Sequence, residues 1–402
     1  MRFNRRPTLG IAGAAVALAV VALVASCGTT PSTSAGPNST STAGQGSPTG
    51  TSSPATSSSA TAQPLRSGER FVNLKVPEPY TPKAPSGGTD EYRCFLVDPK
   101  LTAPAFLTGT QFLPQNAAIV HHAIFFRVAP DSVPKARAVD AQTPGEGWTC
   151  FGDDGVDDDP SWVGHWAPGV KETLLTSGVG YPMPAGSQIV MQVHYNLLAT
   201  GGRPGASDQS GIRLRLTDGA AGFKPLQTQG VEAPVELPCP SGDSGPLCDR
   251  SAAIADVASR FGPQIGHAED NRVRECDPGG SPVPGNTQHC DQPVREAATV
   301  YAVAGHMHLL GRSIKLELNP GTPGARTLLD VPVYNFDDQG IRPLATPVTV
   351  KPGDTLRVTC THYATLRRQL PELHGLPPRY VVWGDGTSDE MCLGLLVVSP
   401  TT

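Results

Sequence analysis

Apolar and polar residues alternate in several short segments of this chain. Between Ser187 and Leu197 every second side chain is apolar, which is the period of a β-strand. Residues 119–126 are β-branched and aromatic apart from a histidine pair, and further strand-like segments span 313–318, 346–350, 355–360 and 391–398. A turn at Lys351–Asp354 joins two of them. The sequence therefore predicts an all-β body, consistent with its 44 glycines and 41 prolines.

One helix is predicted, from Ser251 to Phe261, with Ser251 as its N-cap. It falls within residues 228–292, a stretch rich in Pro, Gly and Asp that carries four cysteines. We interpret this stretch as the junction between two tandem antiparallel β-sandwich domains, of jelly-roll type. The length from Gly68 to Thr402 suits two domains. We place them at residues 68–229 and 230–402, with the boundary near Gly230.

The N-terminal part predicts export and a membrane anchor. Basic residues precede a short apolar segment, Leu9 to Val24, which is typical of a signal peptide over residues 1–26. The following residues resemble a bacterial lipobox, so Cys27 is the expected lipidation site; ordinary cleavage near Ala25 is the alternative. Residues 27–67, rich in Ser, Thr, Gly and Pro, are expected to be a flexible tether. The predicted location is extracytoplasmic, on a membrane through the lipid.

Net charge and cysteine content limit the partners and the cysteine chemistry that the chain can have. The net charge is -5, without a basic cluster, which argues against a nucleic-acid partner. Nine cysteines less Cys27 leave eight in an exported chain. Four disulfides are the expectation, and metal–thiolate sites are the alternative, although no CxxC spacing occurs.

Five histidines and one methionine are candidate metal ligands. His121 and His122 are adjacent, so both rings can bind one ion only at a bulge or a strand end. His194 lies on the polar side of its strand, and by itself it is more typical of a satisfied polar position. His306 and His308 share one strand face, which makes a metal half-site that needs a third donor. Met391 follows a polar loop, residues 384–390, that a core methionine would not need.

Together these segments resemble one family. The segments are Val120-His121-His122-Ala123, Met191-Gln192-Val193-His194-Tyr195, His306-Met307-His308-Leu309-Leu310-Gly311 and Thr387-Ser388-Asp389-Glu390-Met391-Cys392, with Tyr80-Thr81-Pro82-Lys83 and Tyr92-Arg93-Cys94 before them. In order and spacing they are similar to the copper type II, ascorbate-dependent monooxygenases, which include the peptidylglycine α-hydroxylating and dopamine β-hydroxylating enzymes. The resemblance runs from about Pro79 to Val398 and is weak across the cysteine-rich junction.

The resemblance implies two coppers per chain, facing each other across a solvent-filled cleft. His121, His122 and His194 would bind the copper that stores an electron. His306, His308 and Met391 would bind the copper that takes O2, and these three are the expected catalytic residues. Neutral imidazoles suit copper, and a thioether favours Cu(I). The implied partners are a small organic substrate, O2 and ascorbate or another one-electron reductant.

The resemblance also implies cysteine pairs. The family has bridges that match Cys94–Cys150 and Cys360–Cys392, and Cys392 directly follows Met391 on the opposite face of its strand. Cys239–Cys248 and Cys276–Cys290 are then paired by their proximity in the sequence.

The sequence departs from the peptide-amidating members at the expected substrate contacts. Ala304 stands where they carry an arginine that grips the substrate carboxylate, and Leu393 and Leu395 replace polar contacts. A C-terminal glycine peptide is therefore not the expected substrate. The predicted function is hydroxylation of a C–H bond in a small organic molecule. The alternatives are a copper-storage lipoprotein and an adhesive β-sandwich without metal; a zinc hydrolase would not use a methionine ligand.

Overall fold

The computed structural model describes residues 61–401, apart from 85–87, 158–159, 201–203, 205, 220–221 and 278. The predicted signal peptide, Cys27 and most of the predicted tether lie outside the described residues. Residues 58–402 form one compact unit. The end of the predicted tether is in contact with this unit, because Arg215 donates hydrogen bonds to the carbonyls of Gln63 and Pro64. Among the described residues, no helix is long and apolar enough to cross a membrane.

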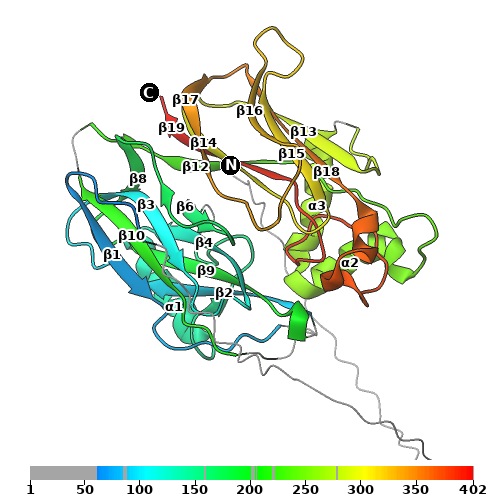
Figure 1. The fold of residues 1–402 in the computed structure, drawn as a ribbon, viewed down its shortest axis with the longest axis horizontal. Helices are drawn as coiled ribbons and strands as arrows, with labels where there is room; N and C mark the ends of the chain where they lie inside the picture. Colours follow the sequence, from blue (N-terminus) through cyan, green and yellow to red (C-terminus); the bar gives the residue numbers. More distant parts are fainter. Residues whose placement is uncertain are drawn as a thin grey trace, which may run out of the picture. The chain divides into compact units, whose positions relative to one another are not determined.

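Two sheets make the first β-sandwich (Figure 1). One has the order β1-β10-β3-β8-β11, with β7 paired to β3, and the other has the order β5-β2-β9-β4-β6. The strands of the first sheet are β1 (Glu69–Lys75), β3 (Ala105–Leu113), β7 (Thr173–Leu174), β8 (Val179–Met183), β10 (Gly211–Asp218) and β11 (Lys224–Pro225). Those of the second are β2 (Asp90–Val97), β4 (Val120–Val128), β5 (Trp148–Thr149), β6 (Ser161–Trp166) and β9 (Gln188–Asn196). The pairing is antiparallel except between β8 and β11.

Two four-stranded sheets make the second sandwich, in the orders β12-β19-β14-β17 and β13-β18-β15-β16. The first contains β12 (Gln227–Glu232), β14 (Ala298–His306), β17 (Arg342–Val350) and β19 (Leu393–Pro400). The second contains β13 (Thr287–Pro293), β15 (Gly311–Leu318), β16 (Arg326–Val331) and β18 (Thr355–His362). All of their pairs are antiparallel. The predicted all-β fold of sandwich domains is thus confirmed.

Each sandwich has its own apolar core. The two cores meet at strand β14 of the second sandwich. Leu107, Met191 and Leu214 are fully buried in the first core, and Leu316 and Val358 are fully buried in the second. A bulge interrupts β14 between Val300 and Ala302. At this bulge, Tyr301 and Ala302 pack with the first core instead of the second. The predicted boundary near Gly230, which lies inside β12, remains a prediction.

The described residues contain three α-helices, of which the sequence predicted one. They are α1 (Val133–Gln142), α2 (Arg250–Phe261) and α3 (Pro263–Cys276). Short 3₁₀ segments are η2 (Pro130–Ser132), η3 (Leu198–Thr200), η4 (Pro246–Cys248), η5 (Ala364–Arg368) and η6 (Pro371–Leu373). The predicted N-cap Ser251 is wrong: Asp249 caps α2 by accepting a hydrogen bond from the Ala252 N–H. The predicted junction thus carries two helices, α2 and α3, between β12 and β13.

All four predicted disulfides are confirmed: Cys94–Cys150, Cys239–Cys248, Cys276–Cys290 and Cys360–Cys392. Cys360 lies on β18, and Cys392 immediately precedes β19. Because these strands belong to different sheets, this bridge ties the two layers of the second sandwich together beside Met391. Met391 itself lies two residues before β19 and not inside the last strand as predicted.

Candidate metal centre

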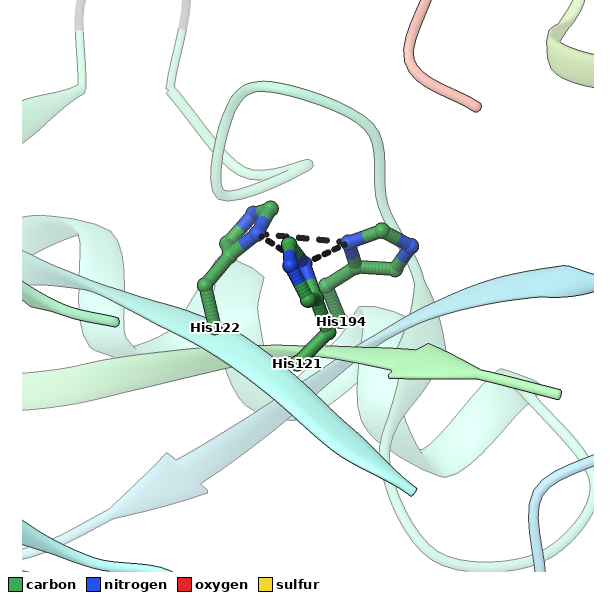
Figure 2. A group of neighbouring side chains, drawn as sticks. All are labelled: His121, His122 and His194. Carbon is green, nitrogen blue, oxygen red and sulfur yellow. Dashed lines mark hydrogen bonds between the residues drawn. The ribbon is translucent and has the colours of Figure 1, made fainter. Parts of the chain in front are cut away.

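A bulge in the first sandwich brings three histidines together. Strands β4 and β9 pair Val120 with Tyr195 and His122 with His194, so the register shifts by one residue at His121. This is the distortion that the adjacent histidine pair requires. The Nδ1 atoms of His121 and His122 are 3.0 Å apart, and each is 3.3 Å from Nδ1 of His194. Figure 2 shows the three rings turned toward one another above their strands. We call them the first histidine set.

The spacing of these nitrogens fits one metal ion. Two nitrogens that bind the same ion at about 2.0 Å lie roughly 3.3 Å apart when the geometry is tetrahedral. Burial and the neighbouring imidazoles, His194 first, hold the pKa values of His121 and His122 well below the usual range. Both rings are therefore neutral near pH 7, which is the protonation state that a metal requires.

A buried carboxylate orients the third ring. His194, which is 1% exposed, places Nε2 2.9 Å from Oδ1 of Asp90. Asp90 also accepts hydrogen bonds from the hydroxyls of Thr387 and Thr89. Burial tends to raise its pKa, but its hydrogen bonds, first with His194 and then with Thr387 and Thr89, lower it to about 2. An anionic Asp90 keeps the proton on Nε2 and leaves Nδ1 of His194 free to bind metal. Tyr92 stacks on the other side of this ring at 4.1 Å between centroids.

The second candidate set lies at the end of β14. His306 is the last residue of that strand, and the centroid of its ring is 5.1 Å from that of His308. His306 Nδ1 pairs with the side-chain oxygen of Gln339, and His308 Nδ1 lies 3.3 Å from the carbonyl of Asp389. Both contacts require a proton on Nδ1, so each Nε2 keeps its lone pair. His308 Nε2 is buried without a hydrogen-bond partner in the described part of the chain. Such an orphaned nitrogen fits a metal ligand.

Burial, followed by the neighbouring His308, lowers the pKa of His306 to about 3. Burial likewise lowers the pKa of His308, against the opposing charge of Glu390. Both rings are thus neutral. The third predicted donor, Met391, is partly buried and packs against the second core. We call His306, His308 and Met391 the second set.

Buried carboxylates position the second set. The loop at 384–390, which the sequence analysis treated as polar, is buried throughout. Glu390 is fully buried and accepts hydrogen bonds from the backbone N–H groups of His308 (2.9 Å) and Leu310 (2.6 Å). His362 Nε2 lies 3.3 Å from the same carboxylate. Glu390 therefore holds the turn that follows His306. Because Glu390 directly precedes Met391 in the sequence, it also ties this turn to the third candidate ligand.

Asp389, the residue before Glu390, anchors the same loop through its own ion pairs. Arg260 donates two hydrogen bonds to its carboxylate, at 2.7 and 2.8 Å, and Arg379 lies 3.4 Å away. Burial tends to raise the pKa of Asp389, but these two guanidinium groups lower it. The carbonyl of the same residue faces His308. A buried ion pair thus anchors the backbone that orients a candidate ligand.

The two sets lie next to each other. The ring centroids of His122 and His306 are 5.9 Å apart. Phe336 stacks on His121 at 4.3 Å and meets His308 edge-on at 6.3 Å. This differs from the solvent-filled cleft implied by the family resemblance, because in this structure side chains occupy the space between these rings. The physical reason is the loop between β16 and β17, which inserts Phe336 there.

The same loop supplies Gln339, the partner of His306. The side-chain nitrogen of Gln339 donates a hydrogen bond to the backbone carbonyl of Phe336, at 2.7 Å. The backbone carbonyl of Gln339 accepts a hydrogen bond from His165 Nε2, at 3.1 Å. His165 lies on β6 of the first sandwich. Gln339 thus joins a ligand of the second set to the first sandwich.

The predicted substrate-contact positions are buried. Ala304, Leu393 and Leu395 are 2%, 8% and 4% exposed, and all belong to the second core. Ala304 pairs with Leu395, and His306 pairs with Leu393 across β14 and β19. The apolar character expected here is therefore present, as packed core next to His306.

Sequence reasoning missed four residues of the centre: Asp90, Phe336, Gln339 and Glu390. Glu390 lies inside one quoted motif and Asp90 lies two residues before another, so an acidic residue in or near a motif was the available signal. Phe336 and Gln339 lie in an irregular loop, residues 332–341, whose sequence carries no metal-site pattern.

Comparisons with known proteins agree with this geometry. Residues 286–400 match the model of the copper type II ascorbate-dependent monooxygenase C-terminal domain. A human protein, "Putative DBH-like monooxygenase protein 2", is 26% identical over 226 residues, 56% of this chain and 36% of that protein. The mouse "DBH-like monooxygenase protein 2" is 38% identical over 89 residues, 22% of this chain and 13% of that protein. The matched segments thus span about a third and an eighth of these relatives.

Among solved structures, the major capsid protein P2 of bacteriophage PM2 aligns with a TM-score of 0.29 and 8% identity, over 83% of this chain and 98% of that chain. A similarity at this level carries no argument. The match of residues 286–400 to the C-terminal domain of the copper type II ascorbate-dependent monooxygenases confirms the resemblance drawn from the motifs.

Proposed function

We propose that this protein is a copper-dependent monooxygenase that hydroxylates a C–H bond of a small organic substrate with O2 and an external one-electron reductant such as ascorbate. The observation that carries the proposal is the pair of unlike donor sets in ring contact, 5.9 Å between His122 and His306. Copper bound at both sets would supply the two electrons that reduction of O2 to hydroxylated product and water takes from outside the substrate.

The donor chemistry favours copper. Three neutral imidazoles suit Cu(I) and Cu(II), while a thioether such as Met391 is a soft donor that favours Cu(I). Zinc sites in hydrolases instead use nitrogen and carboxylate donors with a carboxylate base nearby. The carboxylates here are occupied: Asp90 holds His194, and Glu390 holds the backbone of His308.

The protein's own residues fix the ligands and exclude water. Asp90 and Gln339 each bind the second nitrogen of a histidine, which sets its tautomer and ring orientation. Phe336 covers His121 and borders His308. At 8% exposure or less, His121, His194 and His308 are sheltered from bulk solvent. A sheltered centre prevents reactive oxygen species from leaking before they meet the substrate.

The substrate we propose is not a C-terminal glycine peptide. In the resemblance, the carboxylate clamp of peptide-amidating members is an arginine at the position of Ala304. Ala304, Leu393 and Leu395 are buried core residues beside His306, and their side chains cannot bind a carboxylate.

We also propose that the protein is exported and anchored through lipidated Cys27. Four disulfides support an oxidising compartment. Cys27→Ser should move the protein from the membrane fraction to the soluble fraction. A protein that stays in the membrane fraction after this change would contradict the anchor.

The burial of the histidines favours one second candidate, a copper-storage lipoprotein. A single experiment separates the two functions. Reduced, copper-loaded protein is mixed with ¹⁸O₂ and a panel of small amines, aromatics and lipids. The monooxygenase proposal expects ¹⁸O in a hydroxylated product, lost in Met391→His. Stable copper binding without substrate-dependent ¹⁸O incorporation would support storage.

A further inference from the structure

A cavity lies next to Asp90, the carboxylate that hydrogen bonds to His194 of the first histidine set. It has a volume of about 180 Å³, and it is lined by charged side chains from separate elements. The residues that matter here are Asp90, Asp256, Arg260, Arg367, Arg379 and Ser388. Asp90 also hydrogen bonds to His194, so one carboxylate separates the cavity from a candidate metal ligand.

Two of the three arginines are paired. Arg260 bonds to Asp256 at 2.9 Å and to Asp389 at 2.7 Å. Arg379 contacts the same two carboxylates. The charges of these two arginines and two aspartates therefore balance. The carboxylate oxygens of Asp256 and Asp389 that face the arginines are already engaged. Asp90 is likewise engaged by His194, Thr387 and Thr89.

Arg367 is different. It is 7% exposed and donates hydrogen bonds to the carbonyls of Ser388 (2.9 Å) and Pro377 (3.3 Å). Within the described part of the chain, no carboxylate lies within ion-pair distance of it, and the nearby Asp243 pairs with Arg368. A guanidinium has five N–H donors, so two carbonyl contacts leave donors for another group.

This cation is poorly compensated. Burial, followed by the positive charge of Arg379, lowers the pKa of Arg367 to about 10. A buried charge is costly unless it is paired. Arg367 is thus the guanidinium of this lining that has no carboxylate in ion-pair contact, and its planar fork suits a carboxylate or an enediolate.

We propose that this cavity binds a small organic anion, and that its occupant is the anionic external reductant, of the ascorbate class. The proposal rests on the proposed function. The cavity touches a ligand ring of the first set through Asp90, which hydrogen bonds to His194, whereas it reaches the second set only through the backbone carbonyl of Asp389. This direct contact favours the reductant over a substrate carboxylate. The family of residues 286–400 is ascorbate-dependent.

The electron balance is simple. One ascorbate monoanion loses one electron and one proton and leaves as a radical anion. The electron would go to oxidised copper held by His121, His122 and His194, and the proton would go to water. Two such anions supply the two electrons of one hydroxylation.

The test uses the full chain in two states. In copper-free protein, ascorbate binding is measured by calorimetry under anaerobic conditions. Arg367→Gln should weaken it about tenfold or more, because a charge-assisted contact is lost. Arg367→Lys, which keeps the charge, should restore part of the affinity. Arg368→Gln is the matched control: this neighbour is half exposed, pairs with Asp243, and should leave binding unchanged.

In copper-loaded protein, loss of the Cu(II) electron paramagnetic resonance signal reports reduction. Arg367→Gln should raise the ascorbate concentration for half-maximal rate by a similar factor and should leave reduction by neutral hydroquinone unchanged. If Arg367→Gln does not fold, the arginine Nε resonance of Arg367 in wild type should still shift with ascorbate, and that of Arg368 should not.

Three outcomes would overturn the proposal: equal ascorbate binding in Arg367→Gln and wild type, equal loss with hydroquinone, or binding of carboxylate substrates at Arg367 in place of ascorbate. The binding experiment needs neither copper nor turnover. Failure of the ¹⁸O₂ experiment with intact Arg367-dependent binding would reject the hydroxylase and leave the anion site standing.

Discussion

The two donor sets are built in different ways. In the first set, a bulge between two paired strands brings three Nδ1 atoms within 3.3 Å, so the regular part of the fold makes the site. In the second set, two rings stand at the end of β14, and the backbone around them is held by Asp389 and Glu390 in a buried loop. The first set is complete within one sheet, while the second depends on charges buried around it.

The double substitution of His121 and His122 by alanine tests the division into two sets most strongly. It should reduce bound copper from two ions to one, because the second set keeps its own donors. Elemental analysis of the reconstituted protein measures this ratio. The exposed His289→Ala is the control and should retain both ions. A double variant without any copper would show that the sets are not independent.

Glu390→Ala tests whether the second set depends on its buried loop. Two backbone N–H groups and His362 would lose their acceptor, so unfolding should become easier by about 3–5 kcal/mol. Denaturant unfolding measures this, and copper at the second set should fall with it. The exposed Glu372→Ala should change stability by less than about 0.5 kcal/mol. If Glu390→Ala changed stability as little as Glu372→Ala does, the second set would not depend on its buried loop.

Asp90→Asn sharpens the account of the first set. The substitution keeps the shape but removes the charge that orients His194, so the affinity of that set for copper should fall about 10- to 100-fold. Competition with a copper chelator, run on the protein with one and with two ions, measures it. The second set should be unaffected; weakening at both sets would mean that Asp90 acts on the fold as a whole.

Phe336→Leu should have the smallest effect. It removes the ring stacked on His121 and should cost about 0.5–1.5 kcal/mol of stability. Both coppers should remain bound, because Phe336 donates nothing to either. Thermal unfolding and a copper count check the two parts. Loss of an ion would show that the loop at 332–341 is a structural part of a set.

The unequal construction also explains what the sequence could predict. Strand periodicity and the adjacent pair His121-His122 implied either a bulge or a strand end. The structure has the bulge, which lets both rings point to the same face of the sheet. The disulfide pairs followed from the family and from short separations. The helices α1 and α3 were missed; α1 has a weak apolar stripe with two buried residues, and α3 begins at Pro263 after a glycine.

The parts that could not be predicted depend on contacts between distant segments. Asp90 reaches His194 across neighbouring strands, and Glu390 reaches the backbone of His308 from a loop 82 residues later. Arg260 holds Asp389 from a helix in the predicted junction. A buried carboxylate and a solvent-exposed one look alike in a sequence, since burial is decided by the tertiary packing.

The central claim is that Met391 and two histidines bind a copper unlike the one at the first set. X-ray absorption at the copper edge of the fully reduced protein tests it most directly. The account predicts a copper–sulfur path in wild type that disappears in Met391→His while both ions stay bound. A wild-type spectrum with nitrogen and oxygen scatterers alone would contradict the assignment and, with it, the proposed oxygen chemistry.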